Sequence, residues 1–197
     1  MEILLCRHGE TNLNIVGKTH LPDDEAGLND VGRIQASKLA LVAAEHTVQE
    51  IFCSPERRAI ETAQIVGQPL SLKLTVIDSL KERNWGDWNG EPWNKIELKL
   101  KDKTLNERYT FVPPHGESWE QMQQRLKRTV DNIVLTVNGN IMIVTHGGAL
   151  RALVPVLKHE ELARSLSYNF DNTSVTSFLY SHPASYKLLT ENDTSHI

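Results

Sequence analysis

Two histidine–glycine pairs stand directly after short apolar runs in distant parts of this chain. His8-Gly9 follows residues 3–6 and Arg7, and His146-Gly147 follows residues 140–145. A strand that stops at an imidazole and a glycine presents a nucleophile where the backbone can approach a ligand closely. Two strands that end in this way indicate one site that holds both imidazoles.

Arginines and a glutamate from other parts of the chain extend this candidate site. Arg7 precedes the first histidine, Arg57-Arg58 open a predicted helix, and Glu82 follows a predicted strand. Guanidinium groups stay charged and bind phosphate oxygens in a bidentate way. A neutral imidazole beside such cations is a competent nucleophile toward phosphorus, and a second, cationic imidazole would stabilise charge on the phosphoryl oxygens. A glutamate can protonate the leaving oxygen, so the whole set suits phosphoryl transfer.

The predicted strands and helices alternate along the chain. Strands are predicted over 2–6, 49–53, 72–77, 140–145, 174–180 and 186–190, and helices over 30–45, 57–66, 118–137 and 149–157. This alternation predicts a three-layer α/β/α fold with a mainly parallel central sheet. Such sheets bind ligands at the carboxyl ends of their strands, where Arg7, His8 and His146 fall.

Local signals set the ends of the predicted helices. Ser118 with Gln121 forms a capping-box pattern, and Gly67 is expected to close the helix over 57–66. Ile34 is expected on the apolar face of the helix over 30–45.

The stretch from 86 to 116 interrupts the alternation. It carries two tryptophans, a lysine-rich run over 95–103, and Pro113-Pro114. We expect it to form a small inserted lid subdomain over the site, within a single domain of residues 1–197. The lysines fit a solvated helix face, and the tryptophans are expected to pack the lid.

Composition argues against several classes of protein. The chain has 197 residues and a net charge of −4, so nothing global favours nucleic acid or an anionic membrane. Cys6 and Cys53 are expected to be buried, reduced thiols. A zinc site on His8 and His146 is a poor rival, because no carboxylate or thiolate has ligand spacing. The chain start lacks a basic signal region and no run is long enough to span a membrane, so we expect a cytoplasmic protein; a homodimer stays open.

The order of these motifs resembles the histidine phosphatase superfamily, also called the phosphoglycerate mutase-like family. Its Arg-His-Gly-Glu-Thr signature corresponds to residues 7–11, followed by Asn14. Its Ser-Pro-x-x-Arg-Ala pattern corresponds to residues 54–59, which selects Arg58 over Arg57. Its acid precedes a Gly-x-Trp-x-Gly element, here Glu82, and its second histidine lies in His-Gly-Gly, here His146. Four ordered pieces at predicted element boundaries make a specific match.

The resemblance implies a role for each residue. His8 would be the phosphohistidine nucleophile, and Glu82 the proton donor and later the base for water. The phosphate pocket would consist of Arg7, Arg58 and His146. The candidate substrate-binding residues are Asn14, Thr11, Gly147 and His20. The family implies no metal or organic cofactor, and a small phosphorylated metabolite as partner.

The substrate class follows less directly. Candidates are sugar phosphates, phosphoglycerates, α-ribazole phosphate or a broad set of phosphomonoesters. The segment over 17–29 has one residue more than the family pattern and loses its second glycine, in a region where the family contacts substrate. The mutases carry an Arg-Arg pair in a longer middle section, and only Arg108 stands there among lysines, which favours a phosphatase.

Other interpretations of these residues stay open. A cofactor-dependent phosphoglycerate mutase is the alternative enzyme, and a non-catalytic phospholigand-binding protein is the alternative from another class. The histidines can also be core residues satisfied by hydrogen bonds. Glu82 can simply pair with Arg83 or Lys81, in which case another carboxylate such as Glu10 would be the acid.

Overall fold

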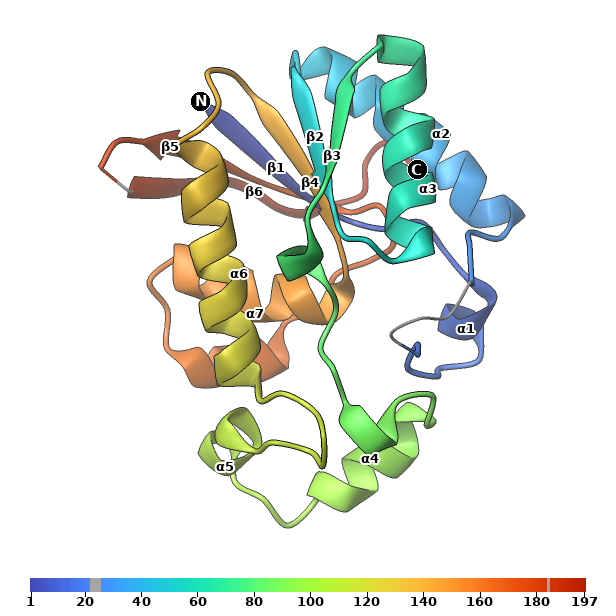
Figure 1. The fold of residues 1–197 in the computed structure, drawn as a ribbon, viewed down its shortest axis with the longest axis vertical. Helices are drawn as coiled ribbons and strands as arrows, with labels where there is room; N and C mark the ends of the chain where they lie inside the picture. The colour runs from blue at the N-terminus through green and yellow to red at the C-terminus, as the bar shows by residue number, and fades with distance from the viewer. Residues whose placement is uncertain (22–25, 184) are drawn as a thin grey trace.

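The computed structural model describes residues 1–21, 26–183 and 185–197, arranged around one six-stranded sheet (Figure 1). The strand order is β3-β2-β4-β1-β5-β6. The strands are β1 (Glu2–Arg7), β2 (Glu50–Cys53), β3 (Lys73–Val76), β4 (Ile141–Thr145), β5 (Val175–Ser181) and β6 (Ser185–Asp193). β3, β2, β4 and β1 pair in parallel, whereas β5 runs antiparallel to β1 and β6. The predicted mainly parallel sheet is confirmed.

Helices cover both faces of the sheet. Successive residues of its central strands point to opposite sides, and these residues are apolar on both sides, so both faces must be buried. Leu4 and Cys6 belong to a buried cluster with residues of α2 (Asp30–Glu45) and α3 (Arg57–Gly67). Ile3 and Leu5 belong to a second cluster with residues of α6 (Trp119–Val134) and α7 (Gly147–Leu157). The fold therefore has the three expected layers (Figure 1).

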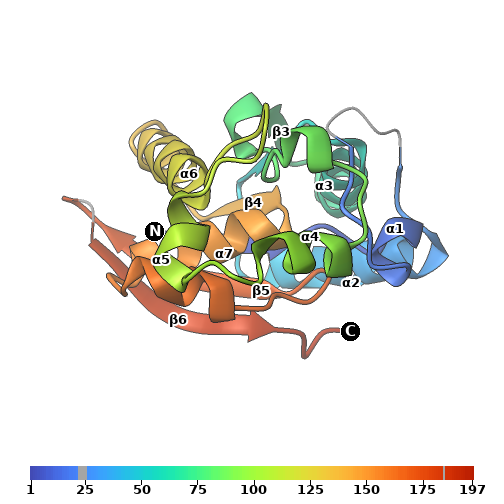
Figure 2. The ribbon, with the colours of Figure 1, turned by 90° about the horizontal axis from the view of Figure 1, so that it is seen from below.

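The segment between β3 and α6 lies beyond the carboxyl ends of the parallel strands. It contains the 3₁₀ turn η3 (Gly86–Trp88), α4 (Trp93–Leu100) and α5 (Leu105–Thr110), which face the viewer in Figure 2. Ile96, Leu100 and Tyr109 anchor this segment in the core cluster of α6. Its packing is apolar, while most of its lysines are exposed.

The loop after β1 is joined to this segment by backbone hydrogen bonds. Lys18 and Pro92 form an isolated antiparallel bridge. Beside it, the Thr19 N–H donates to Glu91 O over 3.1 Å and the Trp93 N–H donates to Gly17 O over 3.1 Å. The altered substrate segment and the predicted lid are thus in direct contact, although about 70 residues of chain separate Lys18 and Pro92.

The remaining elements are short and carry little periodic signal. They are α1 (Asn12–Ile15) and the 3₁₀ turns η1 (Gln68–Leu70), η2 (Asp78–Leu80) and η4 (Leu162–Ser167). Within the described ranges, no helix is long and apolar enough to cross a membrane. Cys6 and Cys53 are both free and buried.

Two local expectations are wrong. Gly67 keeps helical dihedrals, and the chain leaves α3 through η1, with Ser71 in the left-handed conformation at φ 53°. Ile34 is 60% exposed, because the buried face of α2 is made of smaller residues around Leu39. The Ser118–Gln121 capping box is present at the start of α6.

Candidate active site

A cavity of about 300 Å³ lies where β1 and β4 end. Its lining contains seven of the nine residues that the sequence singled out, namely Arg7, His8, Asn14, His20, Arg58, Glu82 and Gly147. The other two, Thr11 and His146, are fully buried next to lining residues. Residues from distant parts of the chain therefore meet at one place.

The His8 ring is buried, and one of its nitrogens is held by the backbone. Nδ1 lies 2.7 Å from the Gly9 carbonyl oxygen, which can only accept, so Nδ1 carries the proton and Nε2 keeps its lone pair. Burial, followed by the charges of Arg58, His146 and Arg7, holds the pKa of His8 well below its usual 6.5. The ring is therefore neutral near pH 7, as a nucleophile must be.

The second imidazole lies beside the first and is anchored from behind. The ring centroids of His8 and His146 are 5.2 Å apart. His146 Nε2 lies 2.7 Å from Glu56 Oε2 and 2.8 Å from Ser54 Oγ. Its Nδ1 has no hydrogen-bond partner among the described residues. Nε2 of His146 is thus occupied by Glu56 and Ser54, and Nδ1 is the nitrogen that can contact a ligand.

Glu56 connects several parts of the site. It accepts a hydrogen bond from the Ser54 hydroxyl, and the Glu82 N–H donates to its Oε1 over 3.3 Å. Arg58 Nη2 lies 3.7 Å from the same oxygen. Burial alone would raise the pKa of this carboxyl. The charge and hydrogen bond of His146, together with Arg58 and Ser54, lower it by more, so the pKa of Glu56 lies well below 4.5. Glu56 is therefore an anion inside a cationic pocket.

The two predicted phosphate-binding arginines reach the cavity from β1 and α3. Arg7 Nη1 donates to Phe170 O over 2.7 Å, while its Nε has no partner among the described residues. Burial lowers the pKa of Arg7, which the charge of Glu82 partly offsets. Arg58 is 1% exposed in the first turn of α3. Arg57 instead turns outward and pairs with Glu61 at 3.0 Å.

Glu82 lines the cavity with its carboxylate held by two backbone donors. The Gly148 N–H donates to Oε2 over 2.9 Å, and the Arg83 N–H donates to Oε1 over 2.8 Å. A Cβ at position 148 would collide with this carboxylate, so glycine gives Glu82 the room it occupies. Glu10, the alternative acid, accepts from Asn29 Nδ2 over 2.9 Å and does not line the cavity.

Asn14 and Thr11 form a small polar frame at the start of α1. The Asn14 N–H donates to Thr11 Oγ1, and the Thr11 N–H donates to Asn14 Oδ1. Asn172, which the sequence did not single out, donates to both Asn14 Oδ1 at 3.3 Å and His8 O at 2.9 Å. Thr11 therefore contacts the site only through its neighbours, whereas Asn14 lines the cavity.

His20 belongs to the same wall. Its Nε2 lies 3.1 Å from Thr11 Oγ1, and its ring centroid is 6.0 Å from that of His8. Burial, followed by the charges of Arg58 and His146, lowers the pKa of His20 to about 3. It therefore enters the cavity as a neutral hydrogen-bonding group. Residues 22–25 of the predicted specificity segment lie outside the described residues.

The cavity wall also holds residues that sequence reasoning missed. Arg151 is one helical turn after Gly147 in α7, a spacing that could have pointed to it. Asn169 has no comparable sequence signal. Trp93, expected to pack the lid, is 38% exposed and lines the cavity.

The lining as a whole is cationic. Its charged side chains comprise six cations and two carboxylates. The cations are Arg7, Lys18, Arg58, Lys81, Arg83 and Arg151, and the carboxylates are Glu56 and Glu82. A protein with a net charge of −4 thus concentrates positive charge in one cavity, which favours an anionic ligand. In the described parts of the chain, no three His, Cys, Asp or Glu side chains are grouped so as to hold a metal ion.

Comparison with known proteins agrees with this geometry. The model of the histidine phosphatase superfamily (branch 1) matches residues 3–194. The phosphoglycerate mutase-like protein 4 of Arabidopsis thaliana is 32% identical over 209 residues, covering 100% of this chain and 86% of that protein. The metal-independent phosphoserine phosphatase of the same plant is 30% identical over 159 residues, covering 77% and 66%.

Solved structures show the same fold. A mycobacterial glucosyl-3-phosphoglycerate phosphatase in complex with VO3 superposes with a TM-score of 0.86 at 26% identity, covering 98% of this chain and 99% of that one. The chain therefore belongs to the histidine phosphatase superfamily, branch 1, and it is a phosphatase.

Proposed function

We propose that this phosphatase hydrolyses small organic phosphate monoesters through a phosphohistidine formed on His8. The observation that carries the proposal is the pairing of a neutral His8, with its Nε2 lone pair unblocked by the backbone, and a ring of cationic groups in one cavity. The phosphoryl group would lie among Arg7, Arg58, the Nδ1 of His146 and the first N–H groups of α7.

The first step transfers the phosphoryl group to the protein. His8 Nε2 attacks phosphorus as the bond to the ester oxygen breaks, and Glu82 gives a proton to that leaving oxygen. Arg7, Arg58 and His146 stabilise the charge on the equatorial oxygens, so catalysis consists mainly of positioning and electrostatics. The backbone donors of Gly148 and Arg83 hold the Glu82 carboxyl in place.

The second step returns the protein to its starting state. A water molecule gives a proton to Glu82 and attacks the phosphohistidine, which releases phosphate and leaves the Nε2 lone pair on His8. The proton gained by Glu82 serves the next turnover. None of these steps uses a metal or an organic cofactor, and a relative is named as metal-independent.

The segment over 86–116 is proposed to act as a lid within a single domain. Trp93, from its helix α4, lines the cavity, and the bridge between Lys18 and Pro92 links the segment to the loop after β1. Its closure would exclude water while the ester bond breaks. The names of relatives favour small acids and sugar derivatives as substrates, since they include phosphoserine and glucosyl-3-phosphoglycerate phosphatases.

A direct experiment tests this function. Purified protein is incubated with p-nitrophenyl phosphate and a panel of phosphorylated metabolites in the presence of EDTA, and phosphate release is measured. Acid-labile ³²P on the protein, trapped by rapid denaturation and absent from His8→Ala, would identify the intermediate. Acid-stable label on the protein, as a phosphoserine would give, base-labile label, as a phosphoaspartate would give, or activity only with added metal, would refute the proposal.

The same assay separates hydrolysis from mutase activity. Arg108, the one arginine in the middle section, pairs with Glu97 at 3.6 Å and does not line the cavity. We therefore expect 3-phosphoglycerate to yield free phosphate without 2-phosphoglycerate, as followed by ³¹P NMR.

A further inference from the structure

The turn from Asp171 to Ser174 is bonded to the end of β1 and contains a strained residue. Thr173 is fully buried and lies in the left-handed region at φ 56°. A β-branched residue rarely adopts such a φ, so the contacts around the turn must hold it there. The Thr173 N–H donates to Arg7 O over 3.1 Å, and the Arg7 N–H donates to Ser174 O over 3.4 Å. The turn is therefore fixed against the backbone directly before the nucleophile.

Asn172 lies inside this turn and directs its side-chain amide toward the site. It does not line the cavity, but its Nδ2 lies 2.9 Å from His8 O and 3.3 Å from Asn14 Oδ1. The His8 carbonyl oxygen can only accept, so the part of Asn172 that faces it is the NH2 group. That group has two hydrogens, one for each acceptor. Asn172 thus links the backbone of the nucleophile to a residue of the cavity wall.

The hydrogen bond from Asn172 helps to set the direction in which the Asn14 amide faces. The Thr11 N–H also donates to Asn14 Oδ1, over 3.1 Å. A backbone N–H can only donate, which identifies this atom as the oxygen, and the two donors together occupy both of its lone pairs. In the described part of the chain, no acceptor is bonded to Asn14 Nδ2. Because Asn14 lines the cavity, its NH2 group is left to donate to a ligand there.

The direction of this amide matters because the cavity suits an anion. Phosphoryl oxygens accept hydrogen bonds, so an NH2 group stabilises them, whereas a carbonyl oxygen in its place repels them. A half-turn of an asparagine amide exchanges these two groups. With Thr11 as the only donor to Oδ1, such a half-turn would cost one hydrogen bond. With Asn172 present it costs two, which favours the orientation that presents the NH2 group.

We infer that Asn172 is a positioning residue for phosphoryl transfer, which orients the Asn14 amide so that Nδ2 donates to a phosphoryl oxygen. The inference rests on the proposed function for the identity of the bound group. Asn172 acts through Asn14 and lies outside the cavity itself. Its hydrogen bond to His8 O keeps its own amide in the orientation that this role requires.

A double-mutant cycle tests this role. Asn14→Ala should lower kcat/KM for p-nitrophenyl phosphate about 10-fold to 100-fold, as for one lost hydrogen bond to a charged group. Asn172→Ala should lower it about 10-fold, because the Asn14 amide is no longer held in one orientation. In the Asn14→Ala background, Asn172→Ala should cost no more than about 2-fold, since the amide that it positions is absent. Losses that simply multiply in the double variant would overturn the proposal.

A second asparagine of the same turn supplies the matched control. Asn192 accepts from the Asp171 N–H over 2.9 Å and donates to Asp171 Oδ2 over 2.8 Å, and no hydrogen bond joins it to Asn14. Asn192→Ala therefore removes an equal side chain from the support of the turn. We expect it to change kcat/KM less than about 2-fold. A loss equal to that in Asn172→Ala would show that only the stability of the turn matters, and would overturn the specific role.

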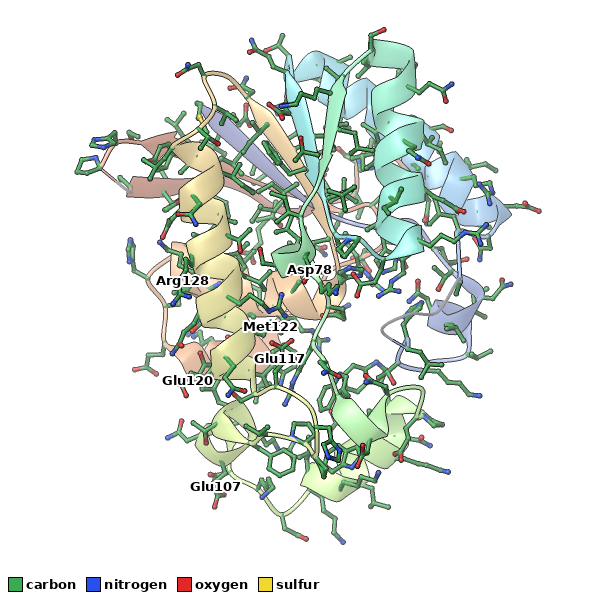
Figure 3. The ribbon with its side chains drawn as sticks, in the orientation of Figure 1. Asp78, Glu107, Glu117, Glu120, Met122 and Arg128 are labelled. Carbon is green, nitrogen blue, oxygen red and sulfur yellow. The ribbon has the colours of Figure 1, made fainter. Side chains whose placement is uncertain are left out.

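A distant arginine shows whether the coupling is specific. Arg128 is exposed on α6 and does not line the cavity (Figure 3). Arg128→Ala should combine with Asn172→Ala by simple multiplication, because distant sites without shared partners act independently. Coupling as strong as that with Asn14 would mean that the cycle reports on folding alone, which would refute the proposal.

Binding of inorganic phosphate keeps this inference distinguishable from the phosphatase function. Phosphate is titrated calorimetrically into the wild-type protein, the two single variants and the double variant. The Kd should rise about 10-fold in Asn172→Ala, with the same dependence on Asn14, and Asn172→Ser should retain part of the affinity because its hydroxyl keeps one donor. This result would uphold the role even if the protein hydrolysed none of the esters tested. An unchanged Kd in both Asn172 variants would refute it, whatever the protein hydrolyses.

Discussion

Glu56 Oε2 lies 2.7 Å from His146 Nε2, so a carboxylate at the start of α3 anchors the imidazole at the end of β4. The contact is possible because β2 and β4 are neighbours in the sheet, which brings the residues after them together. It orients the ring so that Nδ1 is the nitrogen free of the anchor. The cationic cavity thus contains a buried carboxylate, for which we propose a positioning role.

Replacing Glu56 tests that role. In Glu56→Gln, the amide can still fill the space but removes the negative charge that faces His146 and Arg58. We expect kcat for p-nitrophenyl phosphate to fall about 10-fold to 100-fold, and the free energy of unfolding to drop by about 1–3 kcal/mol, as for a lost buried charged hydrogen bond. Steady-state kinetics and urea denaturation measure the two effects. A variant with normal kcat but lower stability would assign Glu56 a structural role only.

Removal of the nucleophile gives the sharpest change. His8→Ala should lower turnover of p-nitrophenyl phosphate at least about 10³-fold, because no other lone pair occupies the position of Nε2. Vanadate or phosphate binding, measured by calorimetry, should persist through Arg7, Arg58 and His146. Turnover at the wild-type rate in this variant would exclude His8 as the nucleophile.

The general acid is tested through the leaving group. Glu82→Gln should slow hydrolysis of glycerol 3-phosphate by about 10²-fold to 10⁴-fold, since an alkoxide needs a proton to depart. Nitrophenolate is a much better leaving group, so p-nitrophenyl phosphate should be affected far less. Gly148→Ala, whose Cβ meets the Glu82 carboxylate, should show the same leaving-group pattern in a milder form. Equal losses on both esters would argue against Glu82 as the acid.

The protonation state of His8 is directly observable. Its pKa is held well below 6.5 by burial and by the neighbouring cations, so the ring should remain neutral through the pH range in which an ordinary imidazole titrates. ¹⁵N NMR of the imidazole, assigned by comparison with His8→Ala, should show the Nδ1–H tautomer without a titration near pH 6.5. A titration at that pH would contradict the assigned environment.

His20 predicts how stability depends on pH. Its pKa of about 3 lies below the value of 6.5 expected in the unfolded chain, so between these values the unfolded state binds more protons. Stability therefore falls as the pH drops through this window, by at most about 1.4 kcal/mol per pH unit from this group. His20→Asn should flatten the decline in urea denaturation measured at pH 7, 5 and 4. An unchanged slope would show that His20 is well solvated.

The sequence predicts the layers of the fold and much of the cavity, because both depend on patterns within short stretches of the chain. Arg7, His8 and Gly147 directly follow or end apolar strand runs, and parallel strands bring such ends to one edge. The helices carry long periodic patterns, as in α6. These features need no knowledge of the distant contacts that each residue makes.

What the sequence does not predict depends on contacts between distant segments. Glu56 gains its role from His146, which is 90 residues away and reaches it only through the strand order. Asn172 and Asn169 lie in the irregular stretch before β5, where no periodicity marks the chain path. The end of α3 is mispredicted for a different reason. The helix continues through Gly67 into a 3₁₀ turn, and Ser71, not a glycine, adopts the left-handed conformation that ends it.

The bridge between Lys18 and Pro92 has a consequence for how this protein can be altered. Main-chain hydrogen bonds join the loop after β1 to the start of α4, and both segments line the cavity, so these two parts of its wall are connected. Exchanging either wall alone with that of a relative would break the pairing and shift the other. A chimera should therefore inherit a new selectivity only when both stretches are transplanted together, so the paired segments are the natural unit for redesign.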